Sequence, residues 1–256
     1  MRAMMTGVAN KFKGGTAGVP VPAFYNTLAL NGTSQYVNSD RFFSDGSGQI
    51  SLAVWFSRAT TGNRDYFCWE ETTAGSGFTR FSCEIKVDNT ITWGGRQTAS
   101  GGFVSMGTTT TTITDSNLHH LAITVDLGTG ASKLYLDGVL DYNVTITDPD
   151  WSSGTMAPAN DVSRIGVSSS SPVNHFNGSM GVFLTFDSVL TANDITELQT
   201  ARQPEDYPSS ITDNYAVALP LNDGVVDPYV DRSGNGNDGI PVGLPTFTGE
   251  QLEFTL

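Results

Sequence analysis

Oxygen-bearing side chains recur at every second position of a glycine-rich stretch near the C-terminus, Asp231–Gly239, which reads DRSGNGNDG. Calcium takes about six to eight oxygen ligands, and this spacing matches the first half of an EF-hand loop. The sequence therefore predicts a candidate calcium site. Its ligands would be Asp231, Ser233, Asn235, Asn237 and Asp238.

The same stretch also fits a tight turn that binds no metal. The bidentate glutamate of an EF-hand would fall at position 242, where the chain has Val242. Asn and Gly tolerate left-handed backbone, and Asp231 and Asn235 can bond amides of their own loop. Both interpretations stay open. A calcium site would draw further charge from Asp223 and Asp227.

Aromatic side chains in turn-rich segments suggest a different chemistry, because an aromatic face can stack on a sugar ring. Trp93, Trp151 and Tyr229 are the candidate ligand-binding residues, and Trp69 lies in a similar setting. Nearby Asn and Asp side chains could bond sugar hydroxyls. The alternative is packing in the core, which we predict for Trp55 between two sheets.

Carboxylate pairs suited to glycoside cleavage are missing from the sequence. A retaining glycosidase needs two carboxyl groups about 5–5.5 Å apart. Glu70 and Glu71 would point to opposite faces of a strand, while Glu84 and Asp88 share a face but lack further acids. No nucleophile elbow, phosphate loop or dinucleotide fingerprint is present. We predict no enzymatic activity, and polysaccharide cleavage is kept as a third alternative.

The cysteines and histidines indicate packing rather than catalysis. Cys68 and Cys83 flank a turn near Gly75, so a hairpin would set them opposite each other, either as a disulfide or as two buried thiols. His119 and His120 are adjacent and would face opposite sides of a strand. Zinc would need more ligands than these residues offer.

Strand patterns broken by turns must position all these groups. From residue 27 onward apolar residues alternate with polar ones, as in QISLAVWFSR, and the five threonines at 108–112 favour a strand. One helix is predicted in residues 190–202, with a capping box at Thr191 and Asp194 and an apolar stripe of Leu190, Ile195 and Leu198. These patterns predict an all-β, two-sheet antiparallel sandwich or jelly roll with one short surface helix.

Charge excludes some partners. The net charge is −13, with nine acidic side chains and one arginine in residues 205–256. We therefore predict no nucleic-acid binding, since no basic stripe could neutralise phosphates. No apolar stretch approaches the roughly 20 residues of a membrane span. Residues 1–22 carry Arg2, Lys11 and Lys13 and no acid, which suggests an arm that docks onto an acidic assembly or, alternatively, a disordered terminus.

Four phrases, in order along residues 27–202, resemble the laminin G-like members of the concanavalin A-like jelly rolls. They are LALNGTSQYV, QISLAVWFSR, LHHLAITVDLGTGASKLYLDGVL and HFNGSMGVFLTFDSVLTANDITELQ. The resemblance implies a two-sheet jelly roll over residues 23–256. It also favours calcium at an edge of the sandwich.

One further family phrase, YAVALPLNDGVVDPYVDRSGNGNDG, usually precedes the others but here comes last. We expect residues 206–256 to complete the same sandwich, because about fifty residues hardly support a separate core. This late placement resembles the jelly rolls of phage structural proteins.

That likeness predicts a non-enzymatic virion protein: a capsid decoration, fibre or tail component. Its partners would be other virion proteins or copies of itself in a homo-oligomer, with surface glycans bound by exposed loops. The alternative is a carbohydrate-binding module of a microbial surface protein, located outside the cell. Calcium is the single cofactor considered.

Overall fold

The computed structural model describes residues 27–71, 79–96, 103–147, 162–168, 172–200, 207–221 and 228–248, which form fifteen strands and two helices. All strand pairs are antiparallel. Sheet A contains, in spatial order, β10 (Val139–Thr145), β9 (Ala131–Leu136), β8 (His119–Asp126), β3 (Gln49–Arg58), β12 (Asn177–Phe186), β1 (Thr27–Asn31) and β15 (Thr246–Thr248), and β13 (Tyr215–Pro220) also pairs with β12. Sheet B contains β14 (Ile240–Val242), β2 (Tyr36–Ser39), β11 (Val162–Ile165), β4 (Asp65–Glu71), β5 (Thr79–Ile85), β6 (Thr90–Gly95) and β7 (Val104–Thr112).

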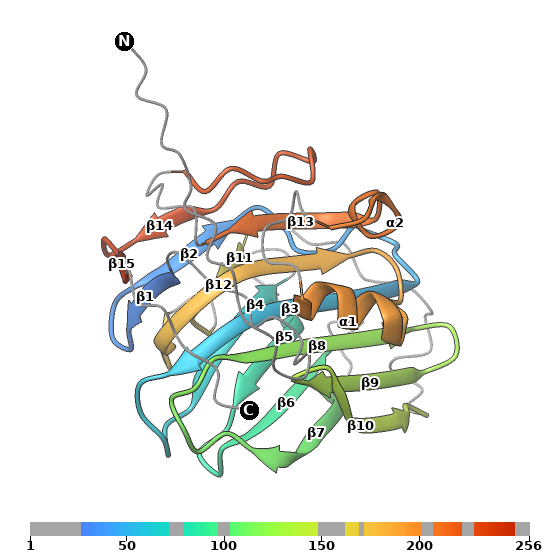
Figure 1. The fold of residues 1–256 in the computed structure, drawn as a ribbon, viewed down its shortest axis with the longest axis horizontal. Coiled ribbons are helices and arrows are strands. Elements are labelled where there is room, and N and C mark those ends of the chain that lie inside the picture. Colours follow the sequence, from blue (N-terminus) through green and yellow to red (C-terminus); the bar gives the residue numbers. More distant parts are fainter. Residues whose placement is uncertain are drawn as a thin grey trace, which may run out of the picture.

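The two sheets pack face to face, which confirms the predicted sandwich (Figure 1). Their inner faces share one apolar core, because alternate residues of each strand point inward. In sheet B the inward residues meet in one cross-strand register. This row is Val37, Ile165, Cys68, Cys83 and Trp93, and all five are buried in the core.

The outward face of sheet A carries a second apolar cluster. Helices α1 (Ala192–Thr200) and α2 (Ser209–Thr212) supply Ile195, Leu198 and Ile211, and α1 lies over sheet A in Figure 1. Trp55 belongs to this cluster and packs on His120 with ring centroids 4.8 Å apart. The prediction that Trp55 packs between the sheets is therefore wrong, because strand alternation turns it outward.

Helix α1 begins with the predicted capping box. The Thr191 amide donates to Asp194 Oδ2 at 2.7 Å, and the Asp194 amide donates to Thr191 Oγ1 at 3.2 Å. The predicted stripe of Leu190, Ile195 and Leu198 is buried. This helix therefore covers sheet A as its apolar spacing indicated.

The late strands pair with early and middle strands of both sheets. Strand β13 pairs with β12 and β15 pairs with β1 in sheet A, while β14 pairs with β2 in sheet B. In Figure 1 the red strands β14 and β15 lie beside the blue β2 and β1. Residues 215–248 thus contribute strands to this same sandwich.

Within the placed parts of the chain, neither helix is long and apolar enough to cross a membrane.

Candidate functional site

The outward face of sheet B carries polar and aromatic side chains in register. Residues opposite each other in antiparallel strands project to the same side of the sheet. In each of these strands, the residue next to the core-row residue points to the opposite side of the sheet and so faces outward. We call this set the outer row: Asn38, Arg164, Trp69, Ser82, Gly94 and Ser105.

Trp69 is the central aromatic of the outer row, and its ring is half-buried. Its indole Nε1 donates to Glu71 Oε1 at 2.8 Å, and the Tyr66 ring meets it edge-on with centroids 5.6 Å apart at 67°. These contacts fix the orientation of the indole while leaving part of it exposed to solvent.

Phe103 is a second aromatic on this face. It is 46% exposed. A side chain at Gly94 would place its Cβ 2.7 Å from Phe103 Cε1 and 2.8 Å from Cζ, so the ring lies directly over that glycine. Gly94 and Trp69 are two strands apart in the outer row, roughly 10 Å at ordinary strand spacing. Two partly exposed aromatic rings therefore lie on this face, with Phe103 covering Gly94 and Trp69 two strands away.

Charged groups lie on this face beside Trp69 and Tyr66, since Arg164 is opposite Trp69 and Glu84 is opposite Tyr66. Arg164 Nε donates to Asn38 Oδ1 at 3.3 Å, and its guanidinium lies 5.8 Å from the centre of the Tyr36 ring. Arg64 Nε forms an ion pair with Glu84 Oε2 at 3.1 Å. Burial raises the pKa of the Glu84 carboxyl, against hydrogen bonding from Tyr66 and the charge of Arg64.

Burial also raises the pKa of Tyr66, and the charge of Glu84 adds to this rise. The Tyr66 phenol therefore stays protonated at neutral pH, and it donates its hydrogen bond to the Glu84 carboxylate. The face as a whole offers aromatic surface with hydrogen-bond donors and acceptors around it. This chemistry suits the binding of a polyhydroxylated ligand.

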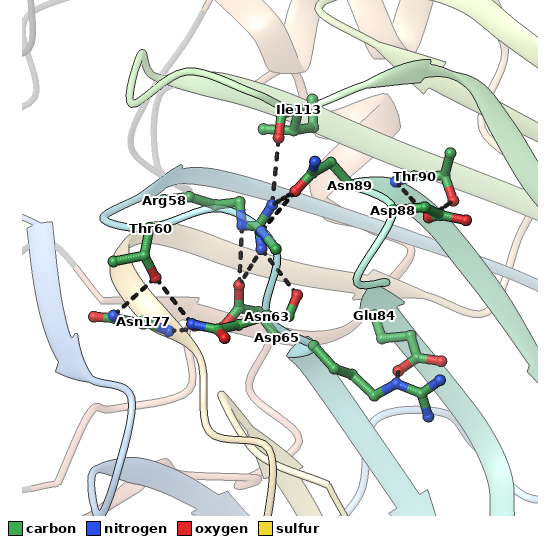
Figure 2. Close-up of polar contacts among 12 residues, drawn as sticks. Arg58, Thr60, Asn63, Asp65, Glu84, Asp88, Asn89, Thr90, Ile113 and Asn177 are labelled. Carbon is green, nitrogen blue, oxygen red and sulfur yellow. Dashed lines mark hydrogen bonds and ion pairs between the residues drawn. The ribbon is translucent and has the colours of Figure 1, made fainter.

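A buried ion pair organises the loops at one end of sheet B, as Figure 2 shows. Arg58 Nη2 lies 2.6 Å from Asp65 Oδ2, and both side chains are within 1% of complete burial. The same guanidinium donates to Asn89 Oδ1 at 2.9 Å and to the carbonyls of Asn63 and Ile113. Three separate loops are thereby tied to β3.

The acid pairs considered for catalysis do not come together. Glu70 is buried and pairs with Arg80 at 3.0 Å, while Glu71 faces outward, so the expected opposite orientation is confirmed. Asp88 bonds Thr90 instead of lying beside Glu84 (Figure 2). Hydrogen bonds from Thr90 lower the pKa of Asp88 to about 2.

The Asp231–Gly239 loop is closed by its own hydrogen bonds. Asp231 Oδ1 accepts from the amides of Ala218 and Ser233, and Oδ2 accepts from Ser233 Oγ and the Asn237 amide. Asn235 and Asn237 turn their Nδ2 groups to the Ala216 carbonyl, while Asp238 accepts from the Asp231 amide. Gly234 and Gly236 take φ values of 82° and 76°, as a tight turn requires.

These contacts fit the turn interpretation of the loop better than a calcium ion, because the carboxylate of Asp231 already has four donors. Among the residues that the structure places, no three His, Cys, Asp or Glu side chains gather closely enough to hold a metal ion. Asp223 and Asp227 lie outside the described residues. Calcium binding at this loop stays a prediction.

Two of the three predicted ligand-binding aromatics are in the core. Trp93 is 1% exposed, and its Nε1 donates to Ser132 Oγ at 2.9 Å. Tyr229 is fully buried and packs edge-on against Phe247. The expectation that either ring is available for stacking is wrong, because Trp93 points inward from β6 and Tyr229 points inward from an isolated bridge to Gly239. Trp151 and the residues of the expected arm, Arg2, Lys11 and Lys13, lie outside the described residues.

The sequence did not single out Phe103, Arg164 or Asn38, whose shared face depends on pairing between strands far apart in the chain. For Phe103 the only local signal is that it follows a glycine pair, Gly101 and Gly102, in the sequence.

The cysteines and histidines have structural surroundings. Cys68 and Cys83 are paired across β4 and β5 as predicted, and both are free, buried thiols whose pKa burial raises. His120 is buried, which lowers its pKa to about 4. Burial opposes protonation of His119 too, but hydrogen bonds and charge from Asp137 and Asp115 outweigh it and raise its pKa.

Solved structures share this fold at low sequence identity. A candidate carbohydrate-binding protein of Bacteroides ovatus has a TM-score of 0.64 and 14% identity, with 91% of this chain and 61% of that chain covered. This chain thus spans less than two thirds of that protein. The heptameric SAP-like pentraxin of Limulus polyphemus gives 0.52 and 14%, over 69% and 82% of the two chains.

The carbohydrate-binding module CBM40 of the Ruminococcus gnavus IT-sialidase gives a TM-score of 0.51 and 12% identity, over 68% of this chain and 97% of the module. That module has also been solved bound to α2,3-sialyllactose. Curated proteins gave no match. The family model for the concanavalin A-like lectin/glucanase superfamily (laminin G type) matches residues 31–196, more than half of the chain. The protein therefore belongs to the concanavalin A-like lectin/glucanase superfamily.

Proposed function

We propose that this protein is a carbohydrate-binding module that recognises a glycan on the outward face of sheet B. The observation that carries the proposal is the outer row, where the partly exposed rings of Trp69 and Phe103 lie two strands apart on the same face. Binding sites for small molecules combine apolar and aromatic surface with a few placed polar groups. The roles of Arg164 and Asn38 would be to bond sugar hydroxyls beside the rings.

The comparisons support this reading more than a virion role. The similar structures include carbohydrate-binding proteins, and the family is named for lectins and glucanases. A binding module of this kind would act outside the cell or at a cell surface, without catalysis of its own. A virion role, including capsid decoration and partner virion proteins, stays a prediction from the sequence.

The test is a glycan array followed by calorimetric titration of the hits, with wild type, Trp69→Ala and Trp69→Phe. Trp69→Ala should weaken binding by at least about tenfold, as expected for the loss of a central aromatic anchor. Trp69→Phe should retain part of the affinity because it keeps an aromatic face.

Leu244→Ala is the matched control, since Leu244 is 83% exposed and lies between β14 and β15, outside the outer row. Its affinity should equal that of wild type. Thermal melts of each variant establish that the fold is intact. Absence of any array hit, or equal affinity of wild type and Trp69→Ala, would overturn the proposal.

A further inference from the structure

A groove of about 590 Å³ opens between β7 and β10, the edge strands of the two sheets on one side of the sandwich. It lies beside the proposed glycan-binding face. Its lining includes Phe103, Ser105, Gly107, Tyr142, Thr145 and Thr147. Phe103 and Ser105 also belong to the outward face of sheet B, so the groove and that face share a border.

The chemistry of the groove is uncharged. Its eleven described lining residues include no acidic or basic side chain, although the chain as a whole has a net charge of −13. The lining instead combines two aromatic rings with hydroxyl groups, of which Ser105, Thr145 and Thr147 are exposed. Burying a charged ligand against such a surface would leave its charge without a partner. The groove therefore favours a neutral ligand rich in hydroxyl groups.

The groove is built by fixed contacts. Asp141 on β10 accepts hydrogen bonds from the amides of Thr110 and Thr111 on β7, at 2.7 and 3.1 Å, and so ties the two edge strands together. Behind the lining, the buried Trp93 ring supports Tyr142, and the two rings meet edge-on with centroids 5.8 Å apart. A Cβ at Gly107 would overlap the Trp93 ring and lie 2.8 Å from Tyr142 Cδ1, so these rings fill the space beside the glycine.

We propose that this groove is a second subsite, which takes uncharged sugar residues of the same glycan that lies on the outward face of sheet B. The chain of sugars passes over Phe103, the residue common to both surfaces. The preferred ligand is thus an extended neutral oligosaccharide rather than a short or acidic one. This inference rests on the proposed function, because the groove adds affinity to a ligand already held at Trp69.

The experiment uses calorimetric titration of the full chain with neutral oligosaccharides of increasing length from the best array class, and with sialyllactose as a charged comparator. Wild type should bind the longer neutral oligosaccharides at least tenfold more tightly than the disaccharide. Thr145→Asp should reduce the affinity for the longer ligands toward that for the disaccharide, and leave disaccharide binding unchanged.

Asn143→Asp is the matched control, because Asn143 is an exposed residue of the same strand that does not line the groove. It introduces the same charge and should change neither affinity. Thr145→Lys, with the opposite charge, should act as Thr145→Asp does if neutrality and shape are the basis of recognition.

The outcomes separate the two proposals. Equal affinity for all lengths, or no difference between Thr145→Asp and wild type, overturns the groove subsite while the effect of Trp69→Ala still supports the main site. Sialyllactose binding as tightly as a neutral ligand of equal length overturns the neutral preference. No effect of Trp69→Ala on any ligand overturns the proposed function, and absence of binding overturns both.

Discussion

Replacing Arg58 by Met should destabilise the fold strongly, because it leaves a buried carboxylate without its cation. Asp65 is 1% exposed and receives two bonds from Arg58, at 2.9 and 2.6 Å. After the change, its remaining side-chain contact is the amide of Asn177 at 3.3 Å. Breaking a buried ion pair from one side costs about 3–5 kcal/mol. For a protein of this size, that corresponds to a fall in melting temperature of roughly 6–20 °C.

The pKa of Asp65 gives this prediction a pH dependence with a definite sign. Burial raises the pKa of Asp65, and the hydrogen bonds and charge of Arg58 oppose that rise. Removal of Arg58 therefore raises the pKa further. An acid whose pKa is higher in the folded state gains stability as pH falls through that pKa. The penalty in Arg58→Met should be largest at neutral pH and shrink toward pH 5, without vanishing, since Asn89, Asn63 and Ile113 also lose their donor.

Urea unfolding followed by tryptophan fluorescence at pH 7.5 and pH 5 measures both effects. Arg41→Met is the matched control, because Arg41 forms an exposed ion pair with Asp45 at 3.5 Å, which is worth about 0–1 kcal/mol. The double variant Arg58→Met/Asp65→Leu should recover part of the loss, since no unpaired charge remains buried. A loss in Arg58→Met no greater than in Arg41→Met would refute the argument that this pair organises the loops.

Five further changes follow from the structure. Thr191→Ala removes the cap of α1 and should cost about 1 kcal/mol in urea unfolding. Asp231→Asn weakens the four hydrogen bonds that this carboxylate accepts in the Asp231–Gly239 loop and should cost about 1–3 kcal/mol. Wild type should melt at the same temperature in excess calcium and in chelator. A higher melting temperature with calcium would establish a metal site instead. Gly107→Ala should cost about 1–3 kcal/mol by overpacking against Trp93, measured by the same unfolding. His120 has a folded pKa of about 4 against an ordinary 6.5, so it destabilises the fold as pH falls through that window, and His120→Phe should reduce the loss of stability in acid. The folded pKa of His119 is raised instead, so His119→Gln should lose more free energy of unfolding at pH 5 than at pH 8.5.

Local patterns in the sequence identified most elements of the fold because they depend on neighbours in the chain. The capping box at Thr191, the period-two strands and the opposed cysteines each follow from residues a few positions apart. The sidedness of single residues was harder to predict. Alternation separates Trp55 from Val54, but it does not say which side faces the other sheet when α1 covers the outer side as well.

The candidate site depends on pairing that no local pattern encodes. Asn38, Arg164 and Trp69 come from three distant segments and meet because β11 lies between β2 and β4. The turn-rich surroundings of Trp93 and Tyr229 suggested exposure, yet the register of β6 and the bridge at Gly239 turn both rings inward. Aromatic residues near turns are therefore poor guides until strand register is known.

The contrast between the two outward faces supports sheet B as the functional face. On sheet A the outward face carries an apolar cluster, as with Ala53 and Leu184, to which the helices contribute Ile195, Leu198 and Ile211. On sheet B the outer row includes polar side chains, as with Asn38 and Arg164. The Trp69 and Phe103 rings of the proposed site stay partly exposed. Burying an aromatic ring is favourable, so folding alone would give these rings a cover such as α1 gives to Trp55. Two rings left exposed among polar groups, on the sheet face that neither described helix covers, are better explained by a ligand that stacks on them.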